Sequence, residues 1–242
     1  MRKMLKAALV ASAVALAMGG VTAANAAGPA PSGGGTQPII GGHNATETYS
    51  WMVALSNGCG GSLVSPQWII TANHCGAASS GRAGSNNKSS GGETVQIDRR
   101  ITRSGTDLTM MHLSRPAQGA PVKMAQSNPA ANTPVRLLGF GCMSWPSCQT
   151  ASYLQEIDLT ILPSSSCAAG GGTSNDVCVS GDRGHSACHG DSGGPAVVGS
   201  RGDWTLVGET HGPGDNGGEC ATSTLYTGIA PYLTWINQQI GS

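Results

Sequence analysis

The sequence predicts an all-β protein, and three observations support this prediction. The chain contains 37 glycines and 13 prolines among 242 residues, which is typical of a fold with many turns. Its apolar residues occur in short runs separated by Gly, Pro and Asn. Only one stretch, close to the C terminus, has the spacing of an amphipathic helix. Composition alone therefore indicates a β-sandwich or a β-barrel.

The short apolar runs are the candidate strands. They are Met52–Leu55, Ser62–Val64, Trp68–Thr71, Val95–Ile97, Val135–Leu138, Glu156–Leu162, Ala196–Val198 and Thr205–Val207. Residues 76–92 are rich in Gly, Ser and Asn and are expected to form a mobile surface loop, and residues 128–134 a turn. A helix is expected to begin at Pro231, with Leu233, Ile236 and Ile240 on one face.

The N terminus has the pattern of an export signal. Arg2, Lys3 and Lys6 precede an apolar region over residues 7–17, and Ala24-Asn25-Ala26 fits a small-residue cleavage site. Residues 1–26 are therefore expected to be a signal peptide, and the protein to be secreted and extracellular. No later apolar run is long enough to suggest a membrane span. Residues 27–38, rich in Pro, Gly and Ala, are expected to be a flexible leader.

The charge balance excludes some classes of partner. The 13 basic and 13 acidic residues cancel, and no charged run suggests nucleic acid or a membrane surface. The remaining segment, residues 39–242, is long enough to bury a sizeable core. We expect a monomer that acts on protein or peptide substrates.

The eight cysteines lie after the export signal, where disulfides are stable. Their spacing does not define the pairing. Only Cys142 and Cys148 lie close enough to suggest two ligands of a zinc knuckle, and no second pair has the matching spacing. We therefore expect four disulfides, no metal and no cofactor.

Two motifs carry chemistry. Cys188-His189-Gly190-Asp191-Ser192-Gly193-Gly194-Pro195 wraps a serine in glycines, and Thr71-Ala72-Asn73-His74-Cys75 places a histidine after an apolar run. A serine hydroxyl needs a base to become nucleophilic, and histidine is the side chain that titrates near neutral pH. Together the motifs indicate a serine hydrolase.

On these motifs the chain resembles the trypsin/chymotrypsin-like serine proteases, from Ile39 to about Ser242, and most closely their small, secreted, actinobacterial-type branch. The resemblance implies two packed six-stranded antiparallel β-barrels with a C-terminal helix. The first barrel would span about 39–120, the second about 121–229 and the helix about 231–240.

The resemblance also implies the catalytic residues. Ser192 would be the nucleophile, His74 the general base and Asp107 the carboxylate that orients the imidazole. The N–H groups of Gly190 and Ser192 would form the oxyanion hole. Asp98 is the competing carboxylate, but it lies beside Arg99 and Arg100 and is expected to form a surface ion pair. Asn73 and Thr109 depart from the family pattern.

Activation in the family creates a new amino terminus that pairs with a buried carboxylate. Here the resemblance assigns these roles to Ile39 and Asp191, so the protein would be a zymogen. The residue before Ile39 is Pro38, where the family has Arg or Lys, and the sequence leaves the activating protease undefined.

The resemblance places the primary pocket at Ser186, Glu209, Thr210, His211 and Gly212. Ser186 would form a neutral floor, which favours apolar or aromatic side chains before the scissile bond. Glu209 in or near the pocket would instead favour Arg or Lys. The far wall, around residues 221–226, is shorter than in the family.

The family also implies disulfides Cys59–Cys75, Cys167–Cys178 and Cys188–Cys220, which leaves Cys142–Cys148 as a local staple by elimination.

Three alternatives remain open. Gly190 to Gly194 also fits G-x-S-x-G, the lipase nucleophile elbow, which requires a strand, a turn and then a helix around the serine. A catalytically inactive protease homologue that acts as a binding module would share every motif. His185, His189 and His211 could gather near the cleft, although their spacing is not that of a usual metal site.

Overall fold

The computed structural model describes residues 39–216, 220 and 222–241. The expected signal peptide (1–26) and leader (27–38) lie outside the described residues, as does Ala221 at the start of the expected pocket wall. Within the described part of the chain, no helix is long and apolar enough to cross a membrane.

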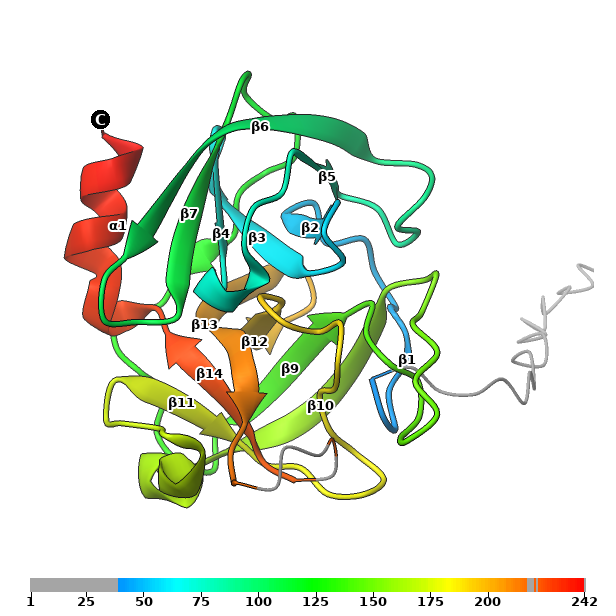
Figure 1. Ribbon diagram of the computed structural model, residues 1–242, viewed down its shortest axis with the longest axis vertical. Helices are drawn as coiled ribbons and strands as arrows, with labels where there is room; N and C mark the ends of the chain where they lie inside the picture. Colours follow the sequence, from blue (N-terminus) through cyan, green and yellow to red (C-terminus); the bar gives the residue numbers. More distant parts are fainter. Residues whose placement is uncertain (1–38, 217–219, 221, 242) are drawn as a thin grey trace, which may run out of the picture. The chain divides into compact units, whose positions relative to one another are not determined.

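The first barrel is a closed ring of six strands (Figure 1). The strands are β2 (Met52–Leu55), β3 (Gly60–Ser65), β4 (Trp68–Thr71), β5 (Ser80–Ala83), β6 (Glu93–Arg103) and β7 (Leu108–Leu113). Their order around the ring is β2-β3-β4-β7-β6-β5, and the antiparallel pairing of β5 with β2 closes it. Closure leaves no free edge that could pair with another chain.

The second barrel also closes. Its strands are β9 (Pro134–Gly139), β10 (Gln155–Leu162), β11 (Asp176–Val179), β12 (Pro195–Ser200), β13 (Asp203–Pro213) and β14 (Thr224–Gly228). They run β10-β11-β14-β13-β12-β9, and the pairing of β9 with β10 completes the ring. The predicted pair of six-stranded antiparallel barrels is confirmed.

Short strands and helical turns complete the fold. Strand β1 (His43–Asn44) pairs with β10, and β8 (Lys123–Met124) runs parallel to β13. The 3₁₀ turns are η1 (Asn73–Cys75), η2 (Ser164–Gly170) and η3 (Ala230–Tyr232). Because β1 lies on the second sheet, the chain after Ile39 begins on the second barrel, whereas the expected boundary put it in the first.

The C-terminal helix α1 (Leu233–Ile240) follows η3 directly. Ile236 is fully buried in the cluster that fills the first barrel, and Leu233 and Ile240 pack against the same cluster. The predicted apolar face of the helix is therefore confirmed. The helix ties the end of the chain to the first barrel.

One expected loop contains a strand. Ser80–Ala83, within the Gly- and Ser-rich stretch 76–92, forms β5 and pairs with both β2 and β6. Its composition is poor in strand-forming residues, but closing the barrel supplies backbone partners on both sides. At Gly81 a Cβ would lie 2.7 Å from a methyl carbon of Val53, so the glycine allows the two strands to approach.

Candidate active site

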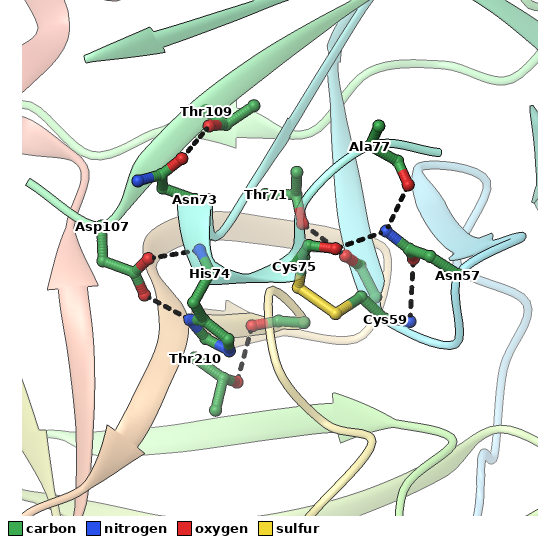
Figure 2. The surroundings of a disulfide bond; sticks show 12 residues. Asn57, Cys59, Thr71, Asn73, His74, Cys75, Ala77, Asp107, Thr109 and Thr210 are labelled. Carbon is green, nitrogen blue, oxygen red and sulfur yellow. Dashed lines mark hydrogen bonds and ion pairs between the residues drawn. A yellow bond between two sulfur atoms is a disulfide. The ribbon is translucent and has the colours of Figure 1, made fainter. Parts of the chain in front are cut away.

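His74 and Asp107 meet because two neighbouring strands end at the same place. Strands β4 and β7 are antiparallel, with Thr71 opposite Thr109, so η1 after β4 and the residues before β7 lie together. The Nδ1 atom of His74 is 2.7 Å from Oδ2 of Asp107, and the backbone N–H of His74 donates to Oδ1 at 2.8 Å (Figure 2). The carboxylate therefore holds both the ring and the backbone of the histidine.

The hydrogen bond that the Nδ1–H group of His74 donates to Asp107 raises the pKa of His74 above its ordinary value, and partial burial opposes part of that rise. The Asp107 side chain is 9% exposed and that of His74 is 42% exposed, so water screens the interaction in part. With Nδ1–H directed at the carboxylate, Nε2 is the nitrogen left to exchange a proton with a reacting group.

The two departures from the family pattern lie in one polar cluster. The side-chain oxygen of Asn73 accepts from Arg100 at 2.5 Å and from Thr102 at 3.3 Å, and the hydroxyl of buried Thr109 donates to it at 3.5 Å (Figure 2). The hydroxyl groups of Thr109 and Thr102 lie 3.0 Å apart, so one of them can donate to the other in place of Asn73. The polar side chain of Asn73 in η1 is therefore hydrogen-bonded to the polar side chain of Thr109 in β7.

Asp98 lies elsewhere. Its carboxylate is 2.7 Å from Nδ1 of His112, and its side chain is 47% exposed. The sequence placed it in a surface ion pair, and the partner is this histidine rather than a neighbouring arginine.

Ser192 and His74 line the same pocket, which has a volume of about 260 Å³. The serine comes from the loop before β12 of the second barrel, and the histidine from the first barrel. Ser192 is followed by a strand, Pro195–Ser200, and not by a helix. The lipase-type alternative, which needs a helix there, is therefore wrong.

The backbone around Ser192 turns through conformations that favour glycine. Gly190 and Gly193 have φ values of +89° and +67°. At Gly193 a Cβ would also lie 2.2 Å from the hydroxyl of Thr71. The N–H groups of Asp191, Gly193 and Gly194 donate within the protein, whereas those of Gly190 and Ser192 donate to no described residue. Two donors thus remain available beside the serine hydroxyl.

Asp191 points away from this pocket into the protein. It is 2% exposed and accepts hydrogen bonds from the N–H groups of Gly141 and Cys188, each at 2.9 Å. Burial raises the pKa of Asp191 to about 7, although both N–H donors oppose the rise. At Gly141 a Cβ would lie 2.5 Å from the carboxyl carbon, so a side chain there would displace the carboxylate. Sequence reasoning missed this glycine, and the Gly-Phe-Gly pattern at 139–141 was the available signal.

The expected new amino terminus lies in the same region. Ile39 is fully buried in the core of the second barrel, and Ile40 forms an isolated β-bridge with Ser186. Ser186 is two residues before Cys188, whose N–H group holds Asp191. Since Ile39 is joined to Pro38 in the intact chain, its nitrogen is an amide there rather than a charged amine.

Three of the expected pocket residues line the pocket, and two do not. Thr210, His211 and Gly212 line it. Ser186 and Glu209 are fully buried and lie outside its lining. The expected far wall contributes Thr222, Ser223 and Thr224, and Cys188 and Cys220 of the expected disulfide also line the pocket. Sequence reasoning missed Ala187 and Pro213. The pairing of Gly212–Pro213 with Leu225–Thr224 brings this second wall beside the first.

Glu209 is instead held between the barrels. The hydroxyl of Ser62 on β3 lies near it and favours the charged form. Neither carboxyl oxygen, nor the Ser62 hydroxyl, has a well-formed hydrogen bond to a described residue. Burial raises the pKa of Glu209 well above its usual value, which favours the neutral form of the carboxyl.

Two of the remaining histidines lie at the pocket. His189 and His211 line it with His74, and the His211 ring stacks over that of His74 with centroids 6.3 Å apart. The Nε2 atom of His211 is 3.8 Å from the Asp107 carboxylate. His185 is directed to Asp182 at 3.2 Å and does not line the pocket.

All four expected disulfides are present: Cys59–Cys75, Cys142–Cys148, Cys167–Cys178 and Cys188–Cys220. The first holds η1, and with it His74, against the start of β3 (Figure 2). Asn57 reinforces this corner by donating to the carbonyl groups of Cys75 and Ala77. The bond between Cys142 and Cys148 removes the pair that had suggested a zinc knuckle.

Comparisons with known proteins agree with this geometry. A sequence model of the family described as Trypsin matches residues 39–236. Trypsin beta of Drosophila erecta is 32% identical over 262 residues, which cover 96% of this chain and 98% of that protein. Trypsin delta of Drosophila melanogaster is also 32% identical, with the same coverage.

A solved structure is similar as well. Neuropsin, a serine protease expressed in the limbic system of mouse brain, superposes with a TM-score of 0.74 at 27% identity. The match covers 82% of this chain and 98% of neuropsin. These relatives are animal proteins, and they give no support to the expected actinobacterial-type branch.

Proposed function

We propose that this chain, which belongs to the trypsin family and is a serine endopeptidase, hydrolyses peptide bonds through an acyl-enzyme on Ser192. The observation that carries this proposal is the His74–Asp107 pair, 2.7 Å apart, on the pocket that Ser192 also lines. Ser192 attacks the carbonyl carbon while His74 takes the hydroxyl proton at Nε2. Protonated His74 then gives that proton to the leaving amine.

Asp107 orients the imidazole and stabilises its positive charge during this cycle. The free N–H groups of Gly190 and Ser192 donate to the oxyanion that develops on the substrate carbonyl. In a water-excluded site such a donor contributes about 3–4 kcal/mol to the transition state.

Activation depends on the pair formed by Ile39 and Asp191. Cleavage after Pro38 creates an ammonium group at Ile39, which supplies the buried Asp191 carboxyl with a charged partner. A buried carboxylate without such a partner is costly, so the loop that carries Gly190 and Ser192 takes its active form only after cleavage.

For the primary pocket we infer a preference for apolar or aromatic side chains. No described residue that lines it is acidic, and Glu209 lies outside its lining. A buried Arg or Lys side chain would therefore lose its hydration without gaining a carboxylate. Peptides that differ only in Phe, Leu, Arg or Glu before the scissile bond test this assignment. A dominant cleavage after Arg would contradict it.

We infer further that residues 1–26 direct export, that residues 27–38 are removed on activation, and that the enzyme acts outside the cell as a monomer. The four disulfides support an extracellular location, because such bonds persist in oxidising compartments. N-terminal sequencing of secreted protein should find chains that begin at Ala27 and at Ile39.

A fluorophosphonate probe separates an active protease from an inactive homologue. The processed enzyme should be labelled on Ser192, and Ser192→Ala should abolish labelling and lower kcat by several orders of magnitude with the fold intact. Absence of labelling in the processed wild-type enzyme, or more than a tenth of its activity in the variant, would contradict the assignment.

A further inference from the structure

A second groove lies beside the active site and carries two basic side chains. It has a volume of about 390 Å³, and its lining includes Arg82, Lys88, Cys59, Phe140 and Thr150. None of the described residues that line it is acidic. The primary pocket shares none of these residues, so the groove is a separate feature of the surface.

The groove begins where the catalytic residues are anchored. Cys59 forms the disulfide with Cys75, the residue after His74. The N–H of Gly60, the residue after Cys59, donates to the carbonyl of Ser192 at 2.9 Å. On the other wall, a methyl carbon of Thr150 lies 3.6 Å from the position that a Cβ of Gly190 would take. The groove therefore starts at the Ser192 loop, from the side of the Cys59–Cys75 disulfide.

Lys88 is held in place at this groove. Its backbone N–H donates to the carbonyl of Ser152 at 3.1 Å, and its ammonium group donates to the hydroxyl of Thr150 at 3.1 Å. Asn87 forms a β-bridge with Tyr153. The loop from the first barrel is thus fastened to the second barrel, so the cation is presented at a defined position rather than on a free side chain.

Neither cation is paired with a carboxylate among the described residues. Arg82 donates to the carbonyl of Gly91 at 2.5 Å, and no described carboxylate lies within ion-pair distance of Arg82 or Lys88. Glu93, on the strand that pairs with β5, is engaged by Arg115 at 2.6 Å. Both side chains are half-buried, where a charge interacts more strongly than in open water.

We propose that this groove binds the leaving-group side of the substrate and selects acidic residues, Asp or Glu, within the first four positions after the scissile bond. The inference rests on the proposed function, because an acyl residue seated in the primary pocket directs the other half of an extended peptide across Ser192 to the opposite side. Arg82 and Lys88 determine the specificity through charge-assisted hydrogen bonds to the substrate carboxylates.

An acyl-transfer assay measures binding on the leaving-group side separately from binding in the primary pocket. The processed enzyme is acylated with a peptide ester, and peptide amines then compete with water for the acyl group. The attacking amine forms the new amide bond, the ester bond to Ser192 breaks, and His74 passes the proton from the amine to the Ser192 oxygen. The ratio of aminolysis to hydrolysis reports how well each acceptor occupies the groove, whatever the primary pocket prefers.

Matched acceptors carry a single Glu or Gln at each of the first four positions. We expect the best Glu acceptor to be used about three- to tenfold more efficiently than its Gln counterpart, as for one or two partly exposed ion pairs. The preference should weaken as the salt concentration rises. It should disappear in the double variant Lys88→Gln/Arg82→Gln, and Lys88→Glu should favour Lys acceptors instead.

Lys123→Gln is the control, because it removes the same charge from a surface lysine paired with Asp203 and outside the groove. It should leave the preference unchanged. Equal use of Glu and Gln acceptors by the wild-type enzyme, or a preference that survives in the double variant, would overturn this inference alone. An ester that forms no acyl-enzyme would overturn the proposed function and the inference with it.

Discussion

Glu156 and Glu209 have equal burial and opposite surroundings. Both are fully buried. Glu156 lies 3.2 Å from Arg136 and accepts hydrogen bonds from Thr46 at 2.7 Å and Tyr49 at 2.5 Å. Glu209 has only the nearby Ser62 hydroxyl, without a well-formed hydrogen bond to a described residue. A buried carboxyl is stable as an anion only where donors compensate for lost hydration.

Replacing each with Gln should therefore have different effects. Glu156→Gln should lower the free energy of unfolding by about 1–3 kcal/mol, because the hydroxyl groups of Thr46 and Tyr49 lose a charged acceptor, whereas Arg136 keeps its bidentate pair with Asp158. Glu209→Gln should change the free energy of unfolding little near pH 4.5. As pH rises, the variant should become more stable than the wild type. Urea denaturation of both variants from pH 4 to pH 9 measures this.

The sign follows from the raised pKa of Glu209. The folded state keeps the proton while the unfolded state loses it above about pH 4.5, so wild-type stability falls as pH rises toward the folded pKa. The Gln variant has no titrating group at this position, so its stability does not fall in this way. A difference between Glu209→Gln and wild type that does not change with pH would show that the carboxyl is not held neutral.

Asp107 determines the protonation of His74. Because its hydrogen bond raises the pKa of the imidazole, Asp107→Asn should lower that pKa, and the histidine should titrate at lower pH in an NMR titration of its ring protons. In the reference protease of this family the same change reduces kcat about 10⁴-fold. An unchanged pKa in the variant would show that Asp107 does not hold the ring in solution.

At the scale of elements, the corner where β4 and η1 meet β6 and β7 holds the base. Asn73, Arg100, Thr102 and Thr109 share hydrogen bonds there, and the backbone of Asn73 donates to the carbonyl of Asp107 at 3.2 Å. The polar residue in η1 and the polar residue in β7 therefore act as one unit.

A double-mutant cycle tests this coupling. Asn73→Ala and Thr109→Val should each destabilise the protein, and the two effects should differ from additivity by about 0.5–1 kcal/mol because they remove members of one network. Asn73→Ala combined with Thr173→Ala should be additive, since Thr173 bonds Asp176 on the second barrel. Additive behaviour of the first pair would mean that the contact between Asn73 and Thr109 contributes nothing.

At the scale of the whole molecule, the two barrels contribute different halves of the site. His74 and Asp107 come from the first barrel, and Ser192 with the pocket walls from the second. Asp191, next to Ser192, has a buried carboxyl that accepts hydrogen bonds from the N–H groups of Gly141 and Cys188. The proposed activation would therefore change the packing of the second barrel and alter a site to which both barrels contribute.

The unprocessed chain should differ from the chain that begins at Ile39 in activity and in the pH dependence of its stability. In the unprocessed chain Asp191 has no ammonium partner, and its pKa is raised. The free energy of unfolding should therefore fall as pH rises from about 4 to about 7, by a total on the order of 4 kcal/mol. In the processed chain the ion pair should remove most of this loss. Chemical denaturation of both forms between pH 4 and pH 8 measures the difference.

The unprocessed chain should also be nearly inactive, and so should a variant with one extra residue before Ile39. Equal activity of the unprocessed chain, the chain that begins at Ile39 and the chain with one extra residue would show that Ile39 contributes only to packing. Identical pH profiles of stability for the unprocessed and processed chains would show the same. Ile39→Val, which keeps the amine and a branched side chain, is the matched control and should stay active.

The sequence by itself determined the chemistry of this protein. Ser192, His74 and Asp107 lie in motifs whose local residues are diagnostic, and the two barrels and helix followed from the family that those motifs indicate. The strands at Met52–Leu55 and Trp68–Thr71 were likewise predictable, because they depend on short-range patterns. The cysteine pairs came from the family resemblance, since their spacing alone does not define them.

The tertiary structure decided what depends on contacts between distant segments. It made β5 a strand because barrel closure overrides a poor local propensity. Glu209 lies outside the pocket lining, which the sequence did not predict. The face on which a strand residue lies depends on register, and the register of β13 is irregular just after this residue. The tertiary structure also brought Lys88 to Thr150, 62 residues apart in the chain, and no local pattern encodes such a meeting of two barrels.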